Sequence, residues 1–479
     1  MSNLDSSLRM NTVPRSADVL IVGGGLAGLV AANRCRQLGY SVVVAEKGQG
    51  ADYRCNSRFA TGVFHISYQD VMDPHGALER VIETATSETA DRNQMSAIAR
   101  NGRRVVRWLQ NEGGQFIVVG PARWQRWVLA PPTPRQAGLN WPGRAGDVLL
   151  RRLRANLTRR GGTFSERTRV TGLKPGSSPW RWLAELELEG GSVSLGARQV
   201  VFADGGFQGD AALVREHIGA APDEYVQRGA GTGGGDCLRM AMGLNASLSN
   251  LSRFYGHVLS VDAFTNNRLW PLPWIDELAA SGLVVDRHGT RFLDEGLGGV
   301  YIANELVRSG NALGAFALFD SRVWQGPGRE TVIPSNPLLK RHGATMFVAP
   351  DIAELAALMS VPADRLLETV NAYNDTVRTR RTETLAPKRS DQHYEPYAML
   401  EPPFYAMPIC AGITYTMGGI RIDGGARVLD NDRRPIKGLY AAGACTGGLE
   451  GGGDVGYVGG LIKASVFGLL SAESIAASS

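Results

Sequence analysis

The pattern of hydrophobic and polar positions begins with an unbroken apolar run at residues 19–22, typical of a strand buried on both faces of a parallel sheet. A glycine-rich turn follows, and the largely apolar segment 26–38 predicts a buried helix. A second apolar run at 41–46 ends on a carboxylate and predicts the next strand. The succession of strand, turn, helix and strand indicates the first β-α-β unit of a parallel sheet.

Further patterned segments extend this picture along the whole chain. Amphipathic or apolar stretches predict helices at 75–88, 91–112, 146–160, 236–244 and from about 461 onward, with a charged helical region at 351–380. Apolar or alternating stretches predict strands at 163–166, 169–173, 182–188, 192–195, 199–204, 282–286, 315–320 and 438–443. A loop rich in Trp, Pro and Arg is expected at 121–143.

The length of the chain predicts more than one domain, because 479 residues exceed what one hydrophobic core usually supports. The glycine-rich character of the first part fades near residue 249 and returns after residue 398. We therefore expect a first domain built from residues 1–248 and 399–479, with a second domain, 249–398, inserted into it. The fold class is α/β, with an α+β second domain.

The turn after the first strand places Gly23, Gly25 and Gly28 at the spacing G-x-G-x-x-G, and Glu46 lies 18 residues further on. In such a unit the first glycine permits the tight turn, the second lets the backbone approach a pyrophosphate, and the third lets the helix pack on the strand. The acidic residue is placed to bind a ribose. The strand, helix and acid around the glycines predict a dinucleotide site.

Composition narrows the class of protein further. Charged residues make up 20% and hydrophobic residues 43%, which fits a globular enzyme, and a net charge of +5 without basic runs argues against nucleic-acid binding. The five cysteines are scattered without C-x-x-C spacing, so we expect no metal site and a reducing, cytoplasmic location. The first 14 residues are polar, and glycines interrupt the apolar stretch 19–32, so we expect neither a secretion signal nor a membrane span.

Six ordered motifs together resemble the FAD-dependent fumarate reductase / 3-ketosteroid Δ1-dehydrogenase superfamily. They lie at residues 23–28, 56–58, 203–207, 282–295, 416–419 and 438–443. The Asn-Ser-Arg and Asp-Glu-Gly variants also look like those of tricarballylate dehydrogenase-type members. The resemblance covers nearly the whole chain and implies a Rossmann-type FAD-binding domain with a substrate-capping domain inserted into it.

This resemblance implies a noncovalent FAD and an external electron donor or acceptor. Carried over by position, it assigns cofactor contacts to Gly23, Gly25, Gly28, Glu46, Asn56, Ser57, Thr61, Gly62, Gly205, Gly206, Gly443, Leu461 and Ile462. The helix that starts near Leu461 would direct its positive end at the pyrimidine edge of the flavin, which stabilises negative charge on the reduced ring.

Three positions depart from the fumarate reductase pattern. The family's proton-donating arginine falls on Gly299 or Val300, the histidine before Thr-Met-Gly-Gly is Tyr415, and the late clamp arginine is Tyr457. A dicarboxylate substrate would lose most of its cationic partners, so the reductase interpretation weakens. Tyrosines at these places resemble ketosteroid dehydrogenases, in which phenols polarise a ketone and remove the adjacent proton.

We therefore hypothesise a flavin dehydrogenase that desaturates the C–C bond next to a carbonyl, with a 3-ketosteroid or 4-oxocyclohexanecarboxylate as example substrates. Tyr457 and the backbone of Gly460 bind the ketone, and Tyr301 acts as base, with Tyr415 as its rival. His257 and Arg144 are candidate substrate contacts, although a structural histidine and a solvated arginine are open alternatives. A reductase of an activated double bond is one competing function, and a flavin monooxygenase, or a flavoprotein that binds FAD without turnover, is the other.

Overall fold

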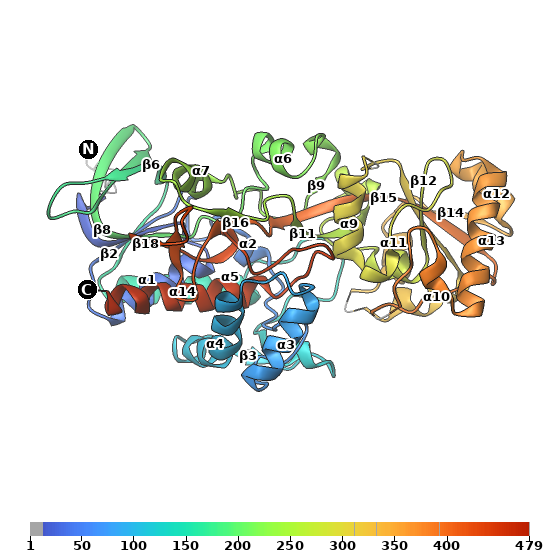
Figure 1. Cartoon of the computed structure of the whole chain (residues 1–479). Coiled ribbons are helices and arrows are strands. Elements are labelled where there is room, and N and C mark those ends of the chain that lie inside the picture. Colours follow the sequence, from blue (N-terminus) through green and yellow to red (C-terminus); the bar gives the residue numbers. More distant parts are fainter. Residues whose placement is uncertain (1–12, 311, 332, 392, 479) are drawn as a thin grey trace, which may run out of the picture.

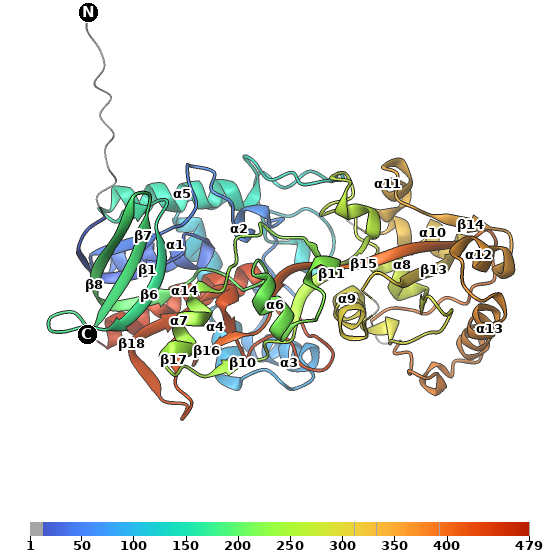
Figure 2. The same cartoon turned by 90° about the horizontal axis from the view of Figure 1, so that it is seen from above.

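The protein consists of two bodies side by side, joined by a long strand (Figure 1). The computed structural model describes residues 13–478 except 311, 332 and 392. The first body contains both described ends of the chain, and the second is formed mainly by the middle of the sequence (Figures 1 and 2). Strand β15 (Phe404–Thr416) runs from one body toward the other.

A mainly parallel sheet forms the centre of the first body, in the order β17-β18-β8-β1-β2-β5. The bounds are β1 Ser16–Val22, β2 Val42–Ala45, β5 Thr163–Ser165, β8 Gly191–Phe202, β17 Arg427–Leu429 and β18 Pro435–Ala441. Strands β6 (Arg169–Pro175) and β7 (Trp182–Leu188) extend β8 as an antiparallel ribbon. The apolar runs of β1 and β2 are buried on both faces, as expected for parallel strands covered by helices.

Helices cover this sheet and fix the glycine-rich turn. Helix α1 (Leu26–Gln37) packs against α14 (Gly460–Ala477) and α5 (Ala145–Arg159), and α14 also contacts α4 (Arg92–Asn111). Of the helices in the described ranges, α14 alone is long and apolar enough to cross a membrane, and 61% of it is buried inside the fold. A helix enclosed by other elements is apolar all round for that reason.

The second body is built on an antiparallel sheet in the order β11-β15-β13-β12. Its strands are β11 Phe254–Ser260, β12 Leu283–Asp286 and β13 Ala315–Asp320, and β14 (Phe347–Ala349) and β9 (Val226–Gln227) pair with β15. The helices here are α8 Asp276–Ser281, α9 Gly299–Arg308, α10 Ser321–Gln325, α11 Ser335–Arg341, α12 Ile352–Met359 and α13 Ala363–Thr379. Strand β15 lies beyond the domain boundary predicted at residue 398, yet pairs within this second sheet.

Short elements complete the chain. They are α2 Asn56–Phe59, α3 His75–Ala85, β3 Phe116–Ile117, β4 Val128–Leu129, α6 Ala211–His217, α7 Asp236–Gly243, β10 Leu248–Ser249, β16 Gly419–Arg421 and β19 Thr446–Gly447. Strand β16 lies between β10 and β19 in a small sheet of its own.

Several elements differ from those the sequence predicts. The helical region predicted at 351–380 is two helices, because Ser360 adopts a left-handed conformation and Pro362 cannot donate a helical hydrogen bond. Strand β8 joins two predicted strands into one through Gly196. Strands β11 and β15 and helix α9 were not predicted at all.

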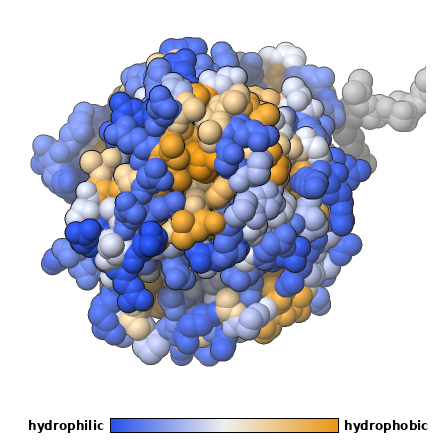
Figure 3. Space-filling model, turned by 90° about the vertical axis from the view of Figure 1, so that its right-hand side faces the viewer, coloured by the Kyte–Doolittle hydropathy of each residue, from blue (hydrophilic) through white to orange (hydrophobic). Residues whose placement is uncertain are grey.

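The far end of the second body carries exposed apolar side chains (Figure 3). Val348, Leu358, Leu367 and Leu400 are each between 43% and 53% exposed. They belong to β14, α12, α13 and the segment before β15.

Candidate functional site

A large cavity of about 1280 Å³ is lined by residues of both bodies. Typical small-molecule sites enclose roughly 300–1,000 Å³, so this space suits an extended ligand together with a second, smaller one. One end of the cavity is formed by the glycine-rich turn after β1, and the other by side chains of β11, α8 and the segment before α14.

The glycine turn is shaped by close backbone contacts. Gly23 has φ +103°, and a Cβ placed on it would lie 2.5 Å from the carbonyl oxygen of Ala203. A Cβ on Gly28 would lie 2.0 Å from the carbonyl oxygen of Gly23, so α1 approaches the strand as only glycine permits. Gly25 faces open space, because its added Cβ would meet only the Ser57 hydroxyl, at 3.6 Å. The backbone is therefore bare where a pyrophosphate would lie.

Two carboxylates lie at this end of the cavity. Glu46 is buried, accepts hydrogen bonds from the amides of Gly24 and Gly48 at 2.7 Å each, and has its pKa raised by burial. Asp204 accepts a bond from the Cys237 amide at 2.9 Å, while its Oδ1 has no partner. Burial raises the pKa of Asp204 to about 6. An unpaired buried acceptor on the cavity wall fits a donor group of a bound nucleotide.

Most of the residues predicted to bind the cofactor line the cavity. These are Gly23, Gly25, Glu46, Asn56, Ser57, Thr61, Gly205, Gly443 and Leu461. Gly28, Gly62, Gly206 and Ile462 are not part of the lining and pack behind it. Asn56 spans two segments, since its amide donates to the Thr414 carbonyl at 2.7 Å and accepts from the Ala230 amide at 2.7 Å.

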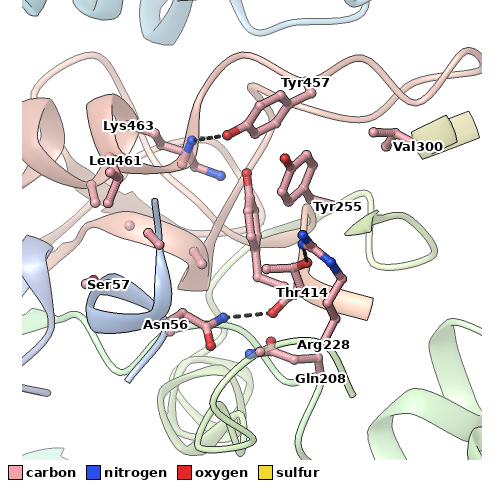
Figure 4. A pocket seen from close by; sticks show the side chains of 18 of the residues that line it. Asn56, Ser57, Gln208, Arg228, Tyr255, Val300, Thr414, Tyr457, Leu461 and Lys463 are labelled. Atoms are coloured by element: carbon pink, nitrogen blue, oxygen red, sulfur yellow. Dashed lines mark hydrogen bonds between the residues drawn. The ribbon is translucent and has the colours of Figure 1, made fainter. Parts of the chain in front are cut away.

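Tyrosines gather in the middle of the cavity. The rings of Tyr457 and Tyr255 are stacked, with centroids 4.0 Å apart and 19° between their planes (Figure 4). The Tyr457 hydroxyl accepts a hydrogen bond from the Gly460 amide at 3.1 Å. Tyr415 also lines the cavity, but its hydroxyl donates to the Glu450 carboxylate at 3.1 Å. Two phenols therefore lie next to each other, and the third is engaged by a carboxylate.

Tyr255 is connected to a buried histidine and aspartate. His257 lies two residues along β11, and its ring meets the Tyr255 ring edge-on with centroids 5.1 Å apart. Its Nε2 is 2.9 Å from the Tyr255 hydroxyl, and its Nδ1 is 2.5 Å from Asp276. The Val258 amide donates to the other Asp276 oxygen at 2.8 Å, and the His257 ring stacks on Trp274 with centroids 4.3 Å apart. All four side chains line the cavity.

Desolvation is the largest cause of the pKa shifts of His257 and Tyr255. It lowers the pKa of His257, with Asp276 opposing the shift, so the neutral imidazole is favoured. It raises the pKa of Tyr255 to about 12, with the cation of Arg228 opposing the shift. The neutral histidine thus accepts a hydrogen bond from a protonated phenol.

Arg228 is a cavity residue that sequence reasoning missed. It follows β9, is half-buried, and donates from Nε to the Pro271 carbonyl at 3.1 Å and from Nη1 to the Thr414 hydroxyl at 2.9 Å. Its guanidinium lies 5.5 Å from the centre of the Trp274 ring. Desolvation lowers its pKa. The partners lie far away in sequence, so only the neighbouring glycine cluster at 229–235 marked the region.

A second missed pair supports the turn that carries Tyr457. Lys463 donates to Glu450 at 3.2 Å and to the Thr446 carbonyl at 2.9 Å, and both charged side chains are buried. Glu450 also accepts from the amides of Val458 and Gly459 at 3.1 and 3.2 Å. The ion pair therefore fixes the backbone between β19 and α14.

The remaining predicted site residues lie elsewhere. Tyr301, on α9, packs against the hydrophobic cluster of Tyr415, Met417 and Val455, as Tyr255 and Tyr457 also do, but is not part of the cavity lining. Arg144 is exposed at the start of α5 and is also outside the lining. Gly299 and Val300 do line the cavity, at the position where the resemblance expects an arginine. Within the described ranges, no group of three or more His, Cys, Asp or Glu side chains is arranged to hold a metal ion.

A family model described as "FAD binding domain" matches residues 18–456. The chain is 24% identical over 474 residues to a probable fumarate reductase, Ifc3, of Shewanella frigidimarina (strain NCIMB 400), covering 96% of this chain and 75% of that one. It is 28% identical over 310 residues to 4-oxocyclohexanecarboxylate 2-dehydrogenase of Sinomonas cyclohexanicum, covering 58% of this chain and 51% of that one. The chain thus spans only about half of the Sinomonas relative.

A similar solved structure is the 3-ketosteroid-delta4-(5alpha)-dehydrogenase from Rhodococcus jostii RHA1 in complex with 4-androstene-3,17-dione. It superposes with a TM-score of 0.73 at 20% identity, covering 98% of this chain and 99% of that one. At this identity the likeness establishes the fold alone.

Proposed function

The chain belongs to the FAD binding domain family and is an FAD-dependent oxidoreductase, and we propose that it desaturates the C–C bond next to a substrate carbonyl. The FAD supplies a ring that accepts a hydride. The bare turn at Gly25, the unpaired oxygen of Asp204 and the open space at Gly205 suit this cofactor. The glycine turn would hold the pyrophosphate, Glu46 the ribose, and Asn56, Ser57 and Leu461 the flavin end.

The observation that carries the proposal is the pair of stacked phenols, one of which is polarised by a backbone amide. Gly460 donates to the Tyr457 hydroxyl, which makes that phenol a stronger donor to a substrate carbonyl. The carbonyl oxygen and the adjacent C–H of a ketone lie on neighbouring atoms. Two hydrogen-bonding groups side by side, such as Tyr457 and Tyr255, can therefore contact both at once.

We assign the removal of the α-proton to Tyr255. As the phenol takes the substrate proton, it passes its own proton to Nε2 of His257 at 2.9 Å. Asp276, 2.5 Å from Nδ1, orients the imidazole and stabilises the imidazolium that results. Tyr457 stabilises the negative charge that develops on the carbonyl oxygen. Tyr301 and Tyr415 are weaker candidates for the base, since one lies outside the cavity lining and the other donates to Glu450.

The second candidate function is reduction of an activated C=C bond. The observation that favours it is Arg228, a cation on the cavity wall that would stabilise negative charge on an acidic substrate. In that direction the same phenol would return the proton. The two candidates share the site and differ in the direction of electron flow.

Anaerobic reduction of the flavin separates the candidates. We expect a saturated cyclic ketone alone to bleach the flavin absorbance, and Tyr457→Phe to retain FAD while bleaching about 100-fold or more slowly. If the ketone bleaches the flavin of Tyr457→Phe as fast as that of the unaltered protein, Tyr457 does not have this role. Bleaching only by an external donor, with reoxidation by an unsaturated acid or ketone, would instead assign the reductase.

The roles of the two domains, the electron acceptor and the cellular compartment are part of the same proposal. We propose that residues 1–248 and 399–479 hold the cofactor and that 249–398 cap the substrate, with β15 linking the two. An external electron acceptor completes the cycle. The five cysteines are free thiols, which supports a reducing compartment such as the cytoplasm.

A further inference from the structure

We propose that Arg228 anchors a carboxylate of the substrate, so that the substrate is a compact cyclic oxo acid and not a neutral ketone. This inference rests on the proposed function for the carbonyl end of the substrate. It deepens that function by naming a second recognition point on the same ligand.

The hydrogen bonds of Arg228 leave one edge of its guanidinium directed at the cavity. Nε and Nη1 are used by the Pro271 carbonyl and the Thr414 hydroxyl, whereas Nη2 has no protein partner in the described ranges. Nη2 is not among the buried polar atoms that lack a partner, so it reaches the open space of the cavity. Figure 4 shows the side chain directed toward Tyr255 and Thr414.

The cation also lacks a protein counterion. Across the described ranges, no Asp or Glu oxygen lies within 4.0 Å of the Arg228 nitrogens. The Asp276 carboxylate is already bound by His257 and the Val258 amide. Glu277 accepts from the Trp274 indole at 2.9 Å, and burial and Asp276 raise its pKa, which favours its neutral form. A desolvated cation without a counterion is costly, and an anionic ligand offsets that cost.

The guanidinium group of Arg228 is held in position by protein contacts in the absence of a ligand. Two hydrogen bonds and the Trp274 ring at 5.5 Å restrict the guanidinium on three sides. A planar guanidinium held in this way offers Nη2 to a carboxylate through a charge-assisted bond with little loss of side-chain freedom. Positional restraint of this kind is typical of a ligand contact.

The carboxylate and the carbonyl must lie close together on the ligand. The Arg228 side chain is directed toward Tyr255 (Figure 4), and Tyr255 is stacked on Tyr457 with ring centroids 4.0 Å apart, so the cation and the phenol pair share one part of the cavity. A ring that presents its ketone to Tyr457 and its carboxylate to Arg228 is therefore small. A small ring that carries both an oxo group and a carboxylate has this arrangement of groups.

The test uses the FAD-loaded protein and two probes that carry no ketone. Cyclohexanecarboxylate and cyclohexanecarboxamide have the same shape and differ in charge, and their binding is followed by the change in flavin absorbance. We expect the acid to bind about 10-fold or more tightly than the amide at pH 7, and Arg228→Gln to weaken the acid about 30-fold or more while changing the amide little. Lys388→Gln, which removes an exposed cation at the cavity wall, serves as the matched control and should leave both affinities unchanged.

Two results would overturn the proposal: an Arg228→Gln protein that still prefers the acid, or a Lys388→Gln protein that loses the preference. If the Arg228→Gln protein does not fold or does not bind FAD, the same two probes are tested with the Arg228→Lys protein. Weaker binding of the acid with unchanged binding of the amide supports the anchor. Equal weakening of the binding of both probes contradicts it. Because the probes cannot be desaturated, this outcome is independent of whether a saturated ketone bleaches the flavin.

Discussion

The imidazole of His257 joins Tyr255 to Asp276, with Nε2 2.9 Å from the phenol oxygen and Nδ1 2.5 Å from the carboxylate. This arrangement lets the buried Tyr255 phenol pass its proton to His257, which a buried phenol without a neighbouring base could not do. Burial raises the pKa of Tyr255 to about 12, so free phenolate is scarce at neutral pH. The histidine makes the phenol useful as a base.

Replacing Tyr255 by Phe tests this assignment. We expect kcat to fall by about 100-fold to 10,000-fold, the usual contribution of a positioned acid or base, with FAD content unchanged. Tyr301→Phe is the matched control, because Tyr301 packs against the same hydrophobic cluster as Tyr255 but does not line the cavity. Steady-state rates with an artificial acceptor dye give the comparison. If kcat falls strongly in Tyr301→Phe while Tyr255→Phe stays active, Tyr301 on α9 is the base and the assignment to Tyr255 is wrong.

The pH dependence of turnover follows from the lowered pKa of His257. Desolvation disfavours the imidazolium, so His257 stays neutral down to acidic pH and accepts the Tyr255 proton throughout the neutral range. As the pH falls through this lowered pKa, the ring becomes protonated and kcat/KM should decline. Asp276 raises the pKa of His257, so Asp276→Asn should lower the rate and move the acidic limb to lower pH. If the acidic limb of the Asp276→Asn profile stays in place or moves to higher pH, Asp276 does not raise the pKa of His257 as proposed.

The glycine turn gives a prediction that is independent of the chemistry. In Gly28→Ala the new Cβ would lie 2.0 Å from the Gly23 carbonyl oxygen, which forces α1 away from the strand. We expect loss of bound FAD and destabilisation by about 1–3 kcal/mol, the usual cost of overpacking. Gly243→Ala is the control, because nothing lies within 4 Å of its added Cβ. Flavin absorbance per protein and the melting temperature report both effects, and a Gly28→Ala protein with full FAD would refute the close-approach argument.

The sequence predicted the first sheet well, because its signals are local. Apolar runs, glycines at fixed spacing and a terminal acid lie within about 30 residues, the length of one β-α-β unit. The phenols Tyr457 and Tyr415 could also be located, since each replaces a charged residue at a motif of the family. Tyrosine in place of arginine or histidine is a readable change of chemistry at a known position.

The rest of the site depends on contacts between distant segments. His257 and Asp276 are 19 residues apart on a strand and a helix, a spacing without a local signature. Arg228 meets Pro271 and Thr414 at separations of 43 and 186 residues, so its burial could not be read from its neighbours. Strand β15 was missed because Pro408 and Gly412 interrupt its apolar pattern, although its pairing with β11 and β13 overrides those weak positions.

The buried pair Lys463–Glu450 leads to the last prediction, which concerns stability. In Lys463→Met, Glu450 would remain buried with only the Val458 and Gly459 amides and the Tyr415 hydroxyl to stabilise its charge. Breaking one side of a buried pair costs about 3–5 kcal/mol, so the melting temperature should fall clearly. The double variant Lys463→Met/Glu450→Gln removes both charges and should recover part of that loss. Lys437→Met, at an exposed position, should have little effect. A double variant no more stable than Lys463→Met would show that the lysine acts through its bond to the Thr446 carbonyl and not through the ion pair.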